Sequence, residues 1–136
     1  MRNIGYSESL TIEFKSDQAK LSDSDIIDAV VAFANTDGGD LYLGVEEDGI
    51  ITGLHSDHKD PTQLAAFIAN RTVPPVTVRC EVIRYDAPVL KISVPRRTSI
   101  VATSSGKMLR RRIKADGKPE NIPMYPSKFK SLPQCR

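Results

Sequence analysis

The residues best suited to chemistry in this chain are the cations of segment 108–114, which reads Met-Leu-Arg-Arg-Arg-Ile-Lys. A strand over this segment would carry Leu109, Arg111 and Ile113 on one face and Arg110, Arg112 and Lys114 on the other. Alternate residues of a strand stand roughly 6.6 to 6.8 Å apart, which can follow a phosphate backbone. A guanidinium group is permanently charged and has fork-shaped donors, so we expect the second face to bind nucleic acid. The alternative is a solvated edge strand whose charges prevent aggregation.

The distribution of charge also indicates an anionic partner. The net charge is +2, but the charges are unevenly distributed along the chain. Residues 1–60 form an acidic part with 4 Lys or Arg and 13 Asp or Glu. Residues 96–136 form a basic part with 11 Lys or Arg and 2 Asp or Glu. Arg96 and Arg97 lie in the basic part and should add to its field, unless the folded chain interleaves the two parts. Aromatic residues make up only 6% of the chain, so few side chains are available to stack on nucleic-acid bases. We therefore expect contacts to the backbone of DNA or RNA, strongly salt-dependent and weakly sequence-specific.

A glycine pair in segment 35–39, Asn-Thr-Asp-Gly-Gly, could serve a phosphate, because a backbone without side chains can approach an anion. Here, however, Gly38 and Gly39 follow a predicted helix and precede a predicted strand, whereas a phosphate loop opens a helix. Neither G-x-x-x-x-G-K-S/T nor G-x-G-x-x-G occurs in the chain. The spacing therefore favours a helix cap and a hairpin over a nucleotide site.

Periodicity and end signals predict the elements that would position these residues. Residues 9–15 alternate with a period of two, which predicts a strand. Ser22 opens a capping box and an apolar stripe at helical spacing, so a helix is expected from there to segment 35–39. Residues 41–45 predict a second strand, and an Asp-Gly pair predicts a hairpin to a short third strand at residues 50–52.

The second half of the chain predicts one more helix and three more strands. Asp60 as cap and Pro61 at the first helical position mark the start of the helix. Its core face would carry Leu64, Phe67 and Ile68. The three strands are expected at residues 77–85, 89–94 and 108–114.

The resulting order, β-α-β-β-α-β-β-β, predicts an α+β fold with two helices packed on one face of a mostly antiparallel sheet. From Asp116 onward the chain is rich in Pro, Lys and Ser and has little periodicity. We therefore assign the domain to residues 1–115. Residues 116–136 are expected to be an irregular basic tail or the start of a linker.

Length and composition indicate one ordinary domain. The chain has 136 residues, of which 40% are hydrophobic and 26% charged, as in soluble globular domains. No apolar run approaches the roughly 18 to 20 residues of a membrane span, and the N-terminal residues lack the apolar core of a secretory signal. The 2 cysteines make no disulfide framework. These features predict a cytoplasmic protein without a membrane partner.

Two sequence blocks resemble a known family. Residues 8–15 read Glu-Ser-Leu-Thr-Ile-Glu-Phe-Lys, and residues 33–39 read Phe-Ala-Asn-Thr-Asp-Gly-Gly, followed by Gly-Val-Glu-Glu-Asp-Gly at 44–49 and Gly-Leu at 53–54. In this order and spacing they resemble the Alba-like domain of the Schlafen family. That domain also occurs at the N-terminus of many bacterial proteins described as transcriptional regulators or ATP-binding proteins. The resemblance is dense from residue 8 to residue 54 and looser to about residue 125.

The resemblance implies association with nucleic acid. In nuclease members of the family, three acidic residues form a metal-dependent RNA-cutting site, and these positions fall on Glu8, Glu13 and Glu47 here. Such carboxylates could hold Mg²⁺ or Mn²⁺ against a scissile phosphate. The third position is usually Asp in the nucleases, and the longer Glu47 puts the metal geometry in doubt, because Mg²⁺ demands near-ideal octahedral placement. The alternative is that Glu8 and Glu13 are solvated or paired with lysine.

Together these observations predict a nucleic-acid-binding module of a transcriptional regulator, which uses Lys15 and the basic C-terminal strand and requires no cofactor. We expect it to be the N-terminal module of a longer protein, and its exposed strands would permit a homodimer. The first alternative is a metal-dependent ribonuclease that uses the three glutamates. The second is a nucleotide-binding domain, as the family's ATP-binding label implies, with Asn35, Gly38 and Gly39 near a phosphate.

Overall fold

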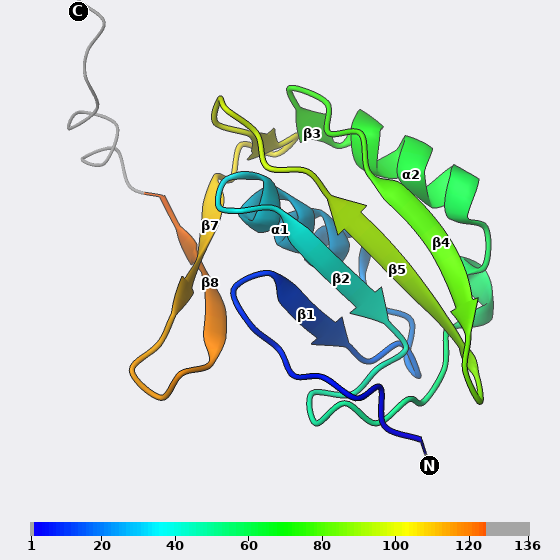
Figure 1. The fold of residues 1–136 in the computed structure, drawn as a ribbon. Helices are drawn as coiled ribbons and strands as arrows, with labels where there is room; N and C mark the ends of the chain where they lie inside the picture. The colour runs from blue at the N-terminus through cyan, green and yellow to red at the C-terminus, as the bar shows by residue number, and fades with distance from the viewer. Residues whose placement is uncertain (1, 125–136) are drawn as a thin grey trace, which may run out of the picture.

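The computed structural model describes residues 2–124, whose elements are shown in Figure 1. The first half contains β1 (Ile12–Lys15), α1 (Asp23–Ala34), β2 (Gly39–Leu43), the 3₁₀ helix η1 (Ser56–His58) and α2 (Pro61–Asn70). The second half contains β3 (Thr72–Val73), β4 (Arg79–Arg84), β5 (Pro88–Val94), β6 (Ala102–Thr103), β7 (Leu109–Ile113) and β8 (Pro119–Pro123). Within residues 2–124, neither α-helix combines the length and apolar character that crossing a membrane requires.

Both α-helices begin at the caps that the sequence predicts. The Ser22 hydroxyl accepts a hydrogen bond from the backbone N–H of Asp25 at 3.2 Å, which satisfies one of the unpaired donors of the first turn of α1. In α2, the Asp60 carboxylate accepts from the N–H of Gln63 at 3.1 Å, and Pro61 occupies the first turn. The start signals of both helices are therefore confirmed.

The main sheet has 4 strands in the order β1-β2-β5-β4. The pair β1 and β2 is parallel, whereas β2 with β5 and β5 with β4 are antiparallel. The parallel pair follows from α1, which connects β1 to β2 as a crossover. The predicted α+β class with a mostly antiparallel sheet is confirmed.

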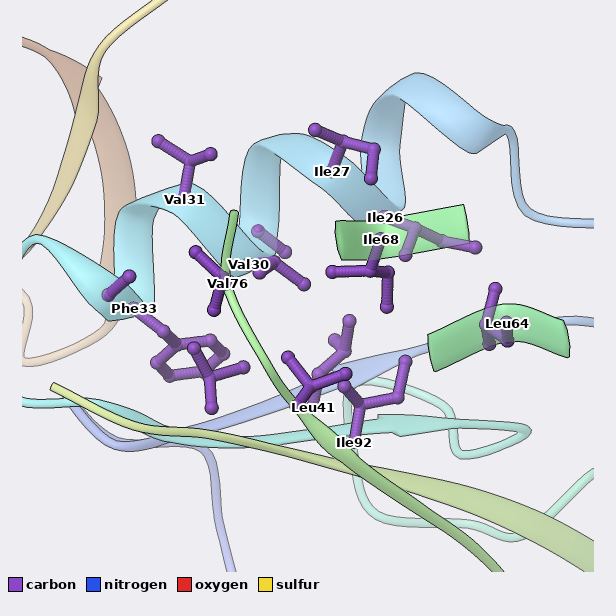
Figure 2. Close-up of a cluster of buried hydrophobic side chains, with 14 of the residues drawn as sticks. Ile26, Ile27, Val30, Val31, Phe33, Leu41, Leu64, Ile68, Val76 and Ile92 are labelled. Carbon is purple, nitrogen blue, oxygen red and sulfur yellow. The ribbon is translucent and has the colours of Figure 1, made fainter. Parts of the chain in front are cut away.

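Both helices cover one face of this sheet, as Figure 2 shows for the buried cluster between them. Apolar side chains of α1, including Ile26, Val30 and Phe33, meet Ile68 of α2 and the inward residues of the sheet, such as Ile92. All five are 0% exposed, so their apolar surface contributes strongly to stability. On α2, Leu64 and Ile68 are buried as predicted, while Phe67 is only partly buried.

A smaller apolar cluster lies on the opposite face of the sheet. It contains Ile4, Phe14, Tyr42, Val45, Ile51 and Val89. The alternation along β2 separates the two clusters: Leu41 and Leu43 join the helical side, and Tyr42 joins the other side. The N-terminal segment and the loop after β2 thus cover this second face at one end, where the Ile4 N–H donates to the carbonyl of Gly49 at 2.8 Å.

Two sequence predictions need correction. The third strand expected at residues 50–52 is reduced to isolated bridges of Ile50 with Asn3 and of Ile51 with Val45. The tail expected to be irregular from Asp116 onward instead forms β8, which pairs with β7 in an antiparallel hairpin. Its short, proline-bounded sequence has no apolar period, so its pairing partner alone defines it as a strand. The rest of that tail, residues 125–136, lies outside the described residues.

Candidate nucleic-acid interface

The predicted basic strand is one arm of the β7–β8 hairpin, which stands beside the β1 side of the sheet (Figure 1). The register places Arg110 opposite Ile122 and Arg112 opposite Glu120. A turn closes the hairpin, in which the N–H of Gly117 donates to the Lys114 carbonyl at 2.9 Å. The hairpin pairs with no strand of the main sheet within residues 2–124.

Three of the predicted binding residues lie together on the outer face of this hairpin, defined here as Arg110, Arg112 and Lys114. Arg112 and Lys114 are exposed and Arg110 is partly buried. Arg112 forms an ion pair with Glu120 at 2.6 Å, and Lys114 lies 3.7 Å from the Asp116 carboxylate. Arg110 makes no ion pair with any residue from 2 to 124. Both pairs are exposed to solvent, so they contribute little stability and can exchange for phosphate contacts.

The inner face of the hairpin carries a buried cation, Arg111, which is 2% exposed. Its guanidinium donates to the carbonyls of Ser9 and Leu10, both at 2.7 Å. It also donates to the Glu13 carboxylate at 2.9 Å and to the Asn121 side chain at 3.1 Å. These four partners leave the buried charge both hydrogen-bonded and neutralised, as burial of a charge requires.

An aromatic ring completes this environment. The guanidinium carbon of Arg111 lies 4.4 Å from the centroid of the Phe33 ring at the end of α1. The backbone N–H of Arg111 donates to the Thr36 hydroxyl at 2.8 Å. The sequence pattern alone assigned no functional or structural role to this arginine. Its position between Leu109 and Ile113, on the apolar side of the strand, could have indicated a buried charge, which requires a counter-ion.

The other predicted cations lie outside the β7–β8 hairpin. Lys15 lies beside Glu13, with 3.4 Å between Nζ and the carboxylate. The backbone N–H of Arg97 donates to the Ala34 carbonyl at 2.9 Å, while its guanidinium donates to the Pro75 carbonyl at 3.1 Å. Arg96 is exposed on the connection after β5. The structure therefore groups the cations of β7 and leaves Lys15 among the carboxylates.

The three glutamates Glu8, Glu13 and Glu47 line one shallow hollow of about 360 Å³, together with Lys15 and Pro119. Glu8 lies before a turn, and its carboxylate accepts the N–H of Phe14 at 3.0 Å. Burial raises the pKa of Glu8, and the negative charges of Glu13 and Glu47 raise it further, against the hydrogen bond from Phe14.

The arrangement of these carboxylates does not fit a metal centre. One oxygen of Glu13 binds Arg111 and the other faces Lys15, so a metal ion would have to compete with two cations of the protein for this carboxylate. Glu47 is exposed. Within residues 2–124, no group of three or more His, Cys, Asp or Glu side chains is placed to hold a metal ion.

The residues predicted for a nucleotide site are engaged within the fold. Asn35 donates through its side-chain amide to the carbonyls of Val101 and Leu109, at 2.8 and 2.9 Å, and accepts from the Val101 N–H at 2.8 Å. Gly38 has a φ of 73°, and a Cβ there would lie 2.7 Å from the Val94 carbonyl. The motif thus ties the end of α1 to the segments before and within β7.

Gly39 shows the same close packing. Its φ is 152°, and a Cβ at this position would lie 2.5 Å from the Thr11 carbonyl and 2.6 Å from the Phe33 ring. Only glycine permits β2 to begin this close to both groups. Contact within the fold therefore accounts for the glycine pair.

One solved structure agrees with this fold. A solved structure of the DIP2311 protein from Corynebacterium diphtheriae matches with a TM-score of 0.70 and 21% identity, over 88% of this chain and 26% of that one. This chain thus spans about a quarter of that protein's length. The N-terminal domain of an ATP-dependent DNA helicase RecG-related protein from Nitrosomonas europaea matches with a TM-score of 0.47 and 25% identity, over 67% of this chain and 66% of that one.

A family model assigns the chain more directly. The model described as Schlafen, AlbA_2 matches residues 8–119. This range includes both sequence blocks that resemble the family and continues through β7 to the first residue of β8. The chain therefore belongs to the Schlafen AlbA_2 family.

Proposed function

We propose that this chain is a nucleic-acid-binding domain that contacts the sugar–phosphate backbone through the outer face of the β7–β8 hairpin. The observation that carries the proposal is the grouping of Arg110, Arg112 and Lys114 on a hairpin that pairs with no other strand within residues 2–124. A two-stranded ribbon of this kind can enter the major groove of a duplex or lie along a backbone. Membership of the Schlafen AlbA_2 family supports a function related to nucleic acid.

The chemistry of the outer face favours affinity over sequence readout. Two guanidinium groups and an ammonium suit phosphate oxygens. The hairpin itself carries no aromatic side chain in residues 109–123 on which a base could stack. We therefore expect binding that weakens steeply with salt and varies little with sequence. If duplex DNA is the preferred ligand, we propose more specifically that the domain belongs to a regulator of transcription.

The nucleotide-binding alternative receives no support from the site, because Asn35 and both glycines serve internal contacts. For the ribonuclease alternative, the shared hollow of the glutamates counts in favour, whereas the engagement of Glu13 by Arg111 counts against. A single assay separates cutting from binding, since cleavage shortens the nucleic acid and binding only retards it.

The test is a gel-shift assay with labelled single-stranded RNA, tRNA and duplex DNA, each with Mn²⁺ and with EDTA, over a range of salt. We expect retarded, intact nucleic acid in both conditions. The variant Arg110→Ala with Arg112→Ala should weaken binding and reduce the salt slope by roughly 1.8 on duplex DNA, about 0.9 for each lost phosphate contact.

The matched control is Arg79→Ala with Arg84→Ala, which removes the same charge from two exposed residues of β4 at the opposite edge of the sheet. Its salt slope should stay close to that of the wild type. Equal losses in both variants would mean that net charge, and not the hairpin, determines binding. Cutting that requires Mn²⁺ would instead identify a nuclease.

A further inference from the structure

Within residues 2–124, the one ion pair between the β7–β8 hairpin and the main sheet is the buried pair of Glu13 with Arg111. We propose that Glu13 is a positioning residue for nucleic-acid binding, which acts through Arg111 to hold the outer cations of the hairpin in place, and that it is not a metal ligand. This inference rests on the proposed function. It gives a role to a carboxylate that the family resemblance would place in a metal site.

Two cations of the protein contact the Glu13 carboxylate. One oxygen lies 2.9 Å from a guanidinium nitrogen of Arg111, and the other lies 3.4 Å from the Lys15 ammonium. The Glu13 side chain is 13% exposed and that of Arg111 is 0% exposed. A metal ion at Glu13 would have to compete with both cations for the carboxylate, and displacement of Arg111 would leave its other acceptors unpaired.

The hydrogen bonds that attach the hairpin to the rest of the domain are concentrated at Leu109 and Arg111. Besides its ion pair, Arg111 reaches the carbonyls of Ser9 and Leu10 in the turn before β1. The other hydrogen bonds between β7 and the rest of the domain also lie at residues 109 and 111. Asn35 donates to the Leu109 carbonyl, and the Thr36 hydroxyl accepts from the Arg111 N–H. Beyond Arg111, the hydrogen bonds of β7 are made to β8.

Two of the outer cations lie directly beside this point of attachment. Arg110 and Arg112 are the immediate neighbours of Arg111, and they point to the opposite side of the strand. A tilt of the strand about Arg111 would therefore move both cations together. Loss of the counter-ion should weaken binding without removing any phosphate contact.

The test compares Glu13→Gln with Glu47→Gln, which makes the same change of charge in the same hollow but at a residue that does not contact Arg111. Binding is measured in EDTA and in Mn²⁺ over a range of salt, with the nucleic acid that the wild type retains most strongly. We expect Glu13→Gln to lower affinity roughly two- to thirtyfold, the range for coupling between positions, equally in EDTA and Mn²⁺.

The salt slope gives the readout that distinguishes positioning from contact. Glu13→Gln should keep the wild-type slope, whereas Arg110→Ala with Arg112→Ala should reduce it. Glu47→Gln should bind at least as tightly as the wild type. Losses that are equal for both glutamate variants and occur only with Mn²⁺ would overturn the inference in favour of a metal site.

A second measurement needs no variant, in case Glu13→Gln does not fold. In the NMR spectrum of the wild type, the Nε–H of Arg111 should exchange slowly, because it is buried and donates to a carbonyl. Titration with Mn²⁺ should leave the amide signals of Phe14 and Lys15 sharp. Selective broadening of these two signals would place a metal ion in the hollow that Glu13 lines with Glu8 and Glu47, and would overturn the inference.

The two proposals fail in different ways. If the wild type retains no nucleic acid at low salt, the proposed function fails. If it binds and loses affinity through Arg110→Ala with Arg112→Ala, but Glu13→Gln binds like the wild type, the proposed function stands and the role of Glu13 is refuted.

Discussion

Replacement of Arg111 tests whether one buried arginine connects the hairpin to the sheet. Arg111→Ala removes the charge-assisted bond to Glu13 at 2.9 Å and leaves the Ser9 and Leu10 carbonyls without their donor. Breaking a buried pair by removal of one partner costs about 3–5 kcal/mol. Arg111→Lys keeps the charge but loses the forked geometry, so we expect an intermediate loss of about 1.5–3 kcal/mol, the contribution of one hydrogen bond to a charged group.

Thermal and urea unfolding measure this loss. For a domain of this size, 1 kcal/mol corresponds to about 3–6 °C in Tm, so Arg111→Ala should lower Tm by about 10 °C or more. The control is Arg112→Ala, one residue along the same strand, whose exposed pair with Glu120 should contribute less than about 1 kcal/mol. Equal losses for the two variants would refute the reasoning, because the effect would then follow the charge and not the burial.

Three further predictions concern single residues. Gly39→Ala should destabilise the protein strongly in urea unfolding, because its Cβ would lie 2.5 Å from the Thr11 carbonyl; a midpoint equal to that of the wild type would refute this. The pKa of Glu8 is raised on folding, so its contribution to stability is present below its ordinary pKa of 4.5 and is lost as pH rises through the folded value. Glu8→Gln should therefore flatten the dependence of Tm on pH between 4 and 8, and an unchanged profile would contradict it. Burial raises the pKa of Cys80 to about 11, so in a Cys135→Ser background alkylation at pH 8 should be on the order of 100-fold slower in the folded than in the unfolded protein.

Local signals in the sequence were sufficient for the helices and for most of the strands of the main sheet. The caps at Ser22 and Asp60 and the alternation over residues 41–43 and 89–94 are local, and each agrees with the packing of its element. The strand β8 could not be predicted in this way. Its residues have no apolar period, and it exists because β7 supplies the hydrogen-bond partners.

The candidate site depended even more on long-range contacts. Alternation correctly separated Arg110 and Arg112 from Arg111, but it could not show that Arg111 lies against a carboxylate 98 residues away. A buried cation implies a counter-ion, and sequence periodicity does not identify which acid supplies it. The family resemblance marked Glu13, and only the fold shows its partner.

The same contacts explain why the two sequence blocks occur together. Glu13 of the first block and Phe33 of the second both contact the Arg111 guanidinium, and Asn35 binds the carbonyl of Leu109, two residues before Arg111. Both blocks thus converge on the base of the β7–β8 hairpin, and they would be required for a binding domain as much as for a nuclease. The blocks alone therefore do not distinguish the two functions. The partner of Glu13 supports our proposal of a binding domain, because a carboxylate held by a buried arginine can orient the hairpin, whereas a metal ion would have to compete with that arginine.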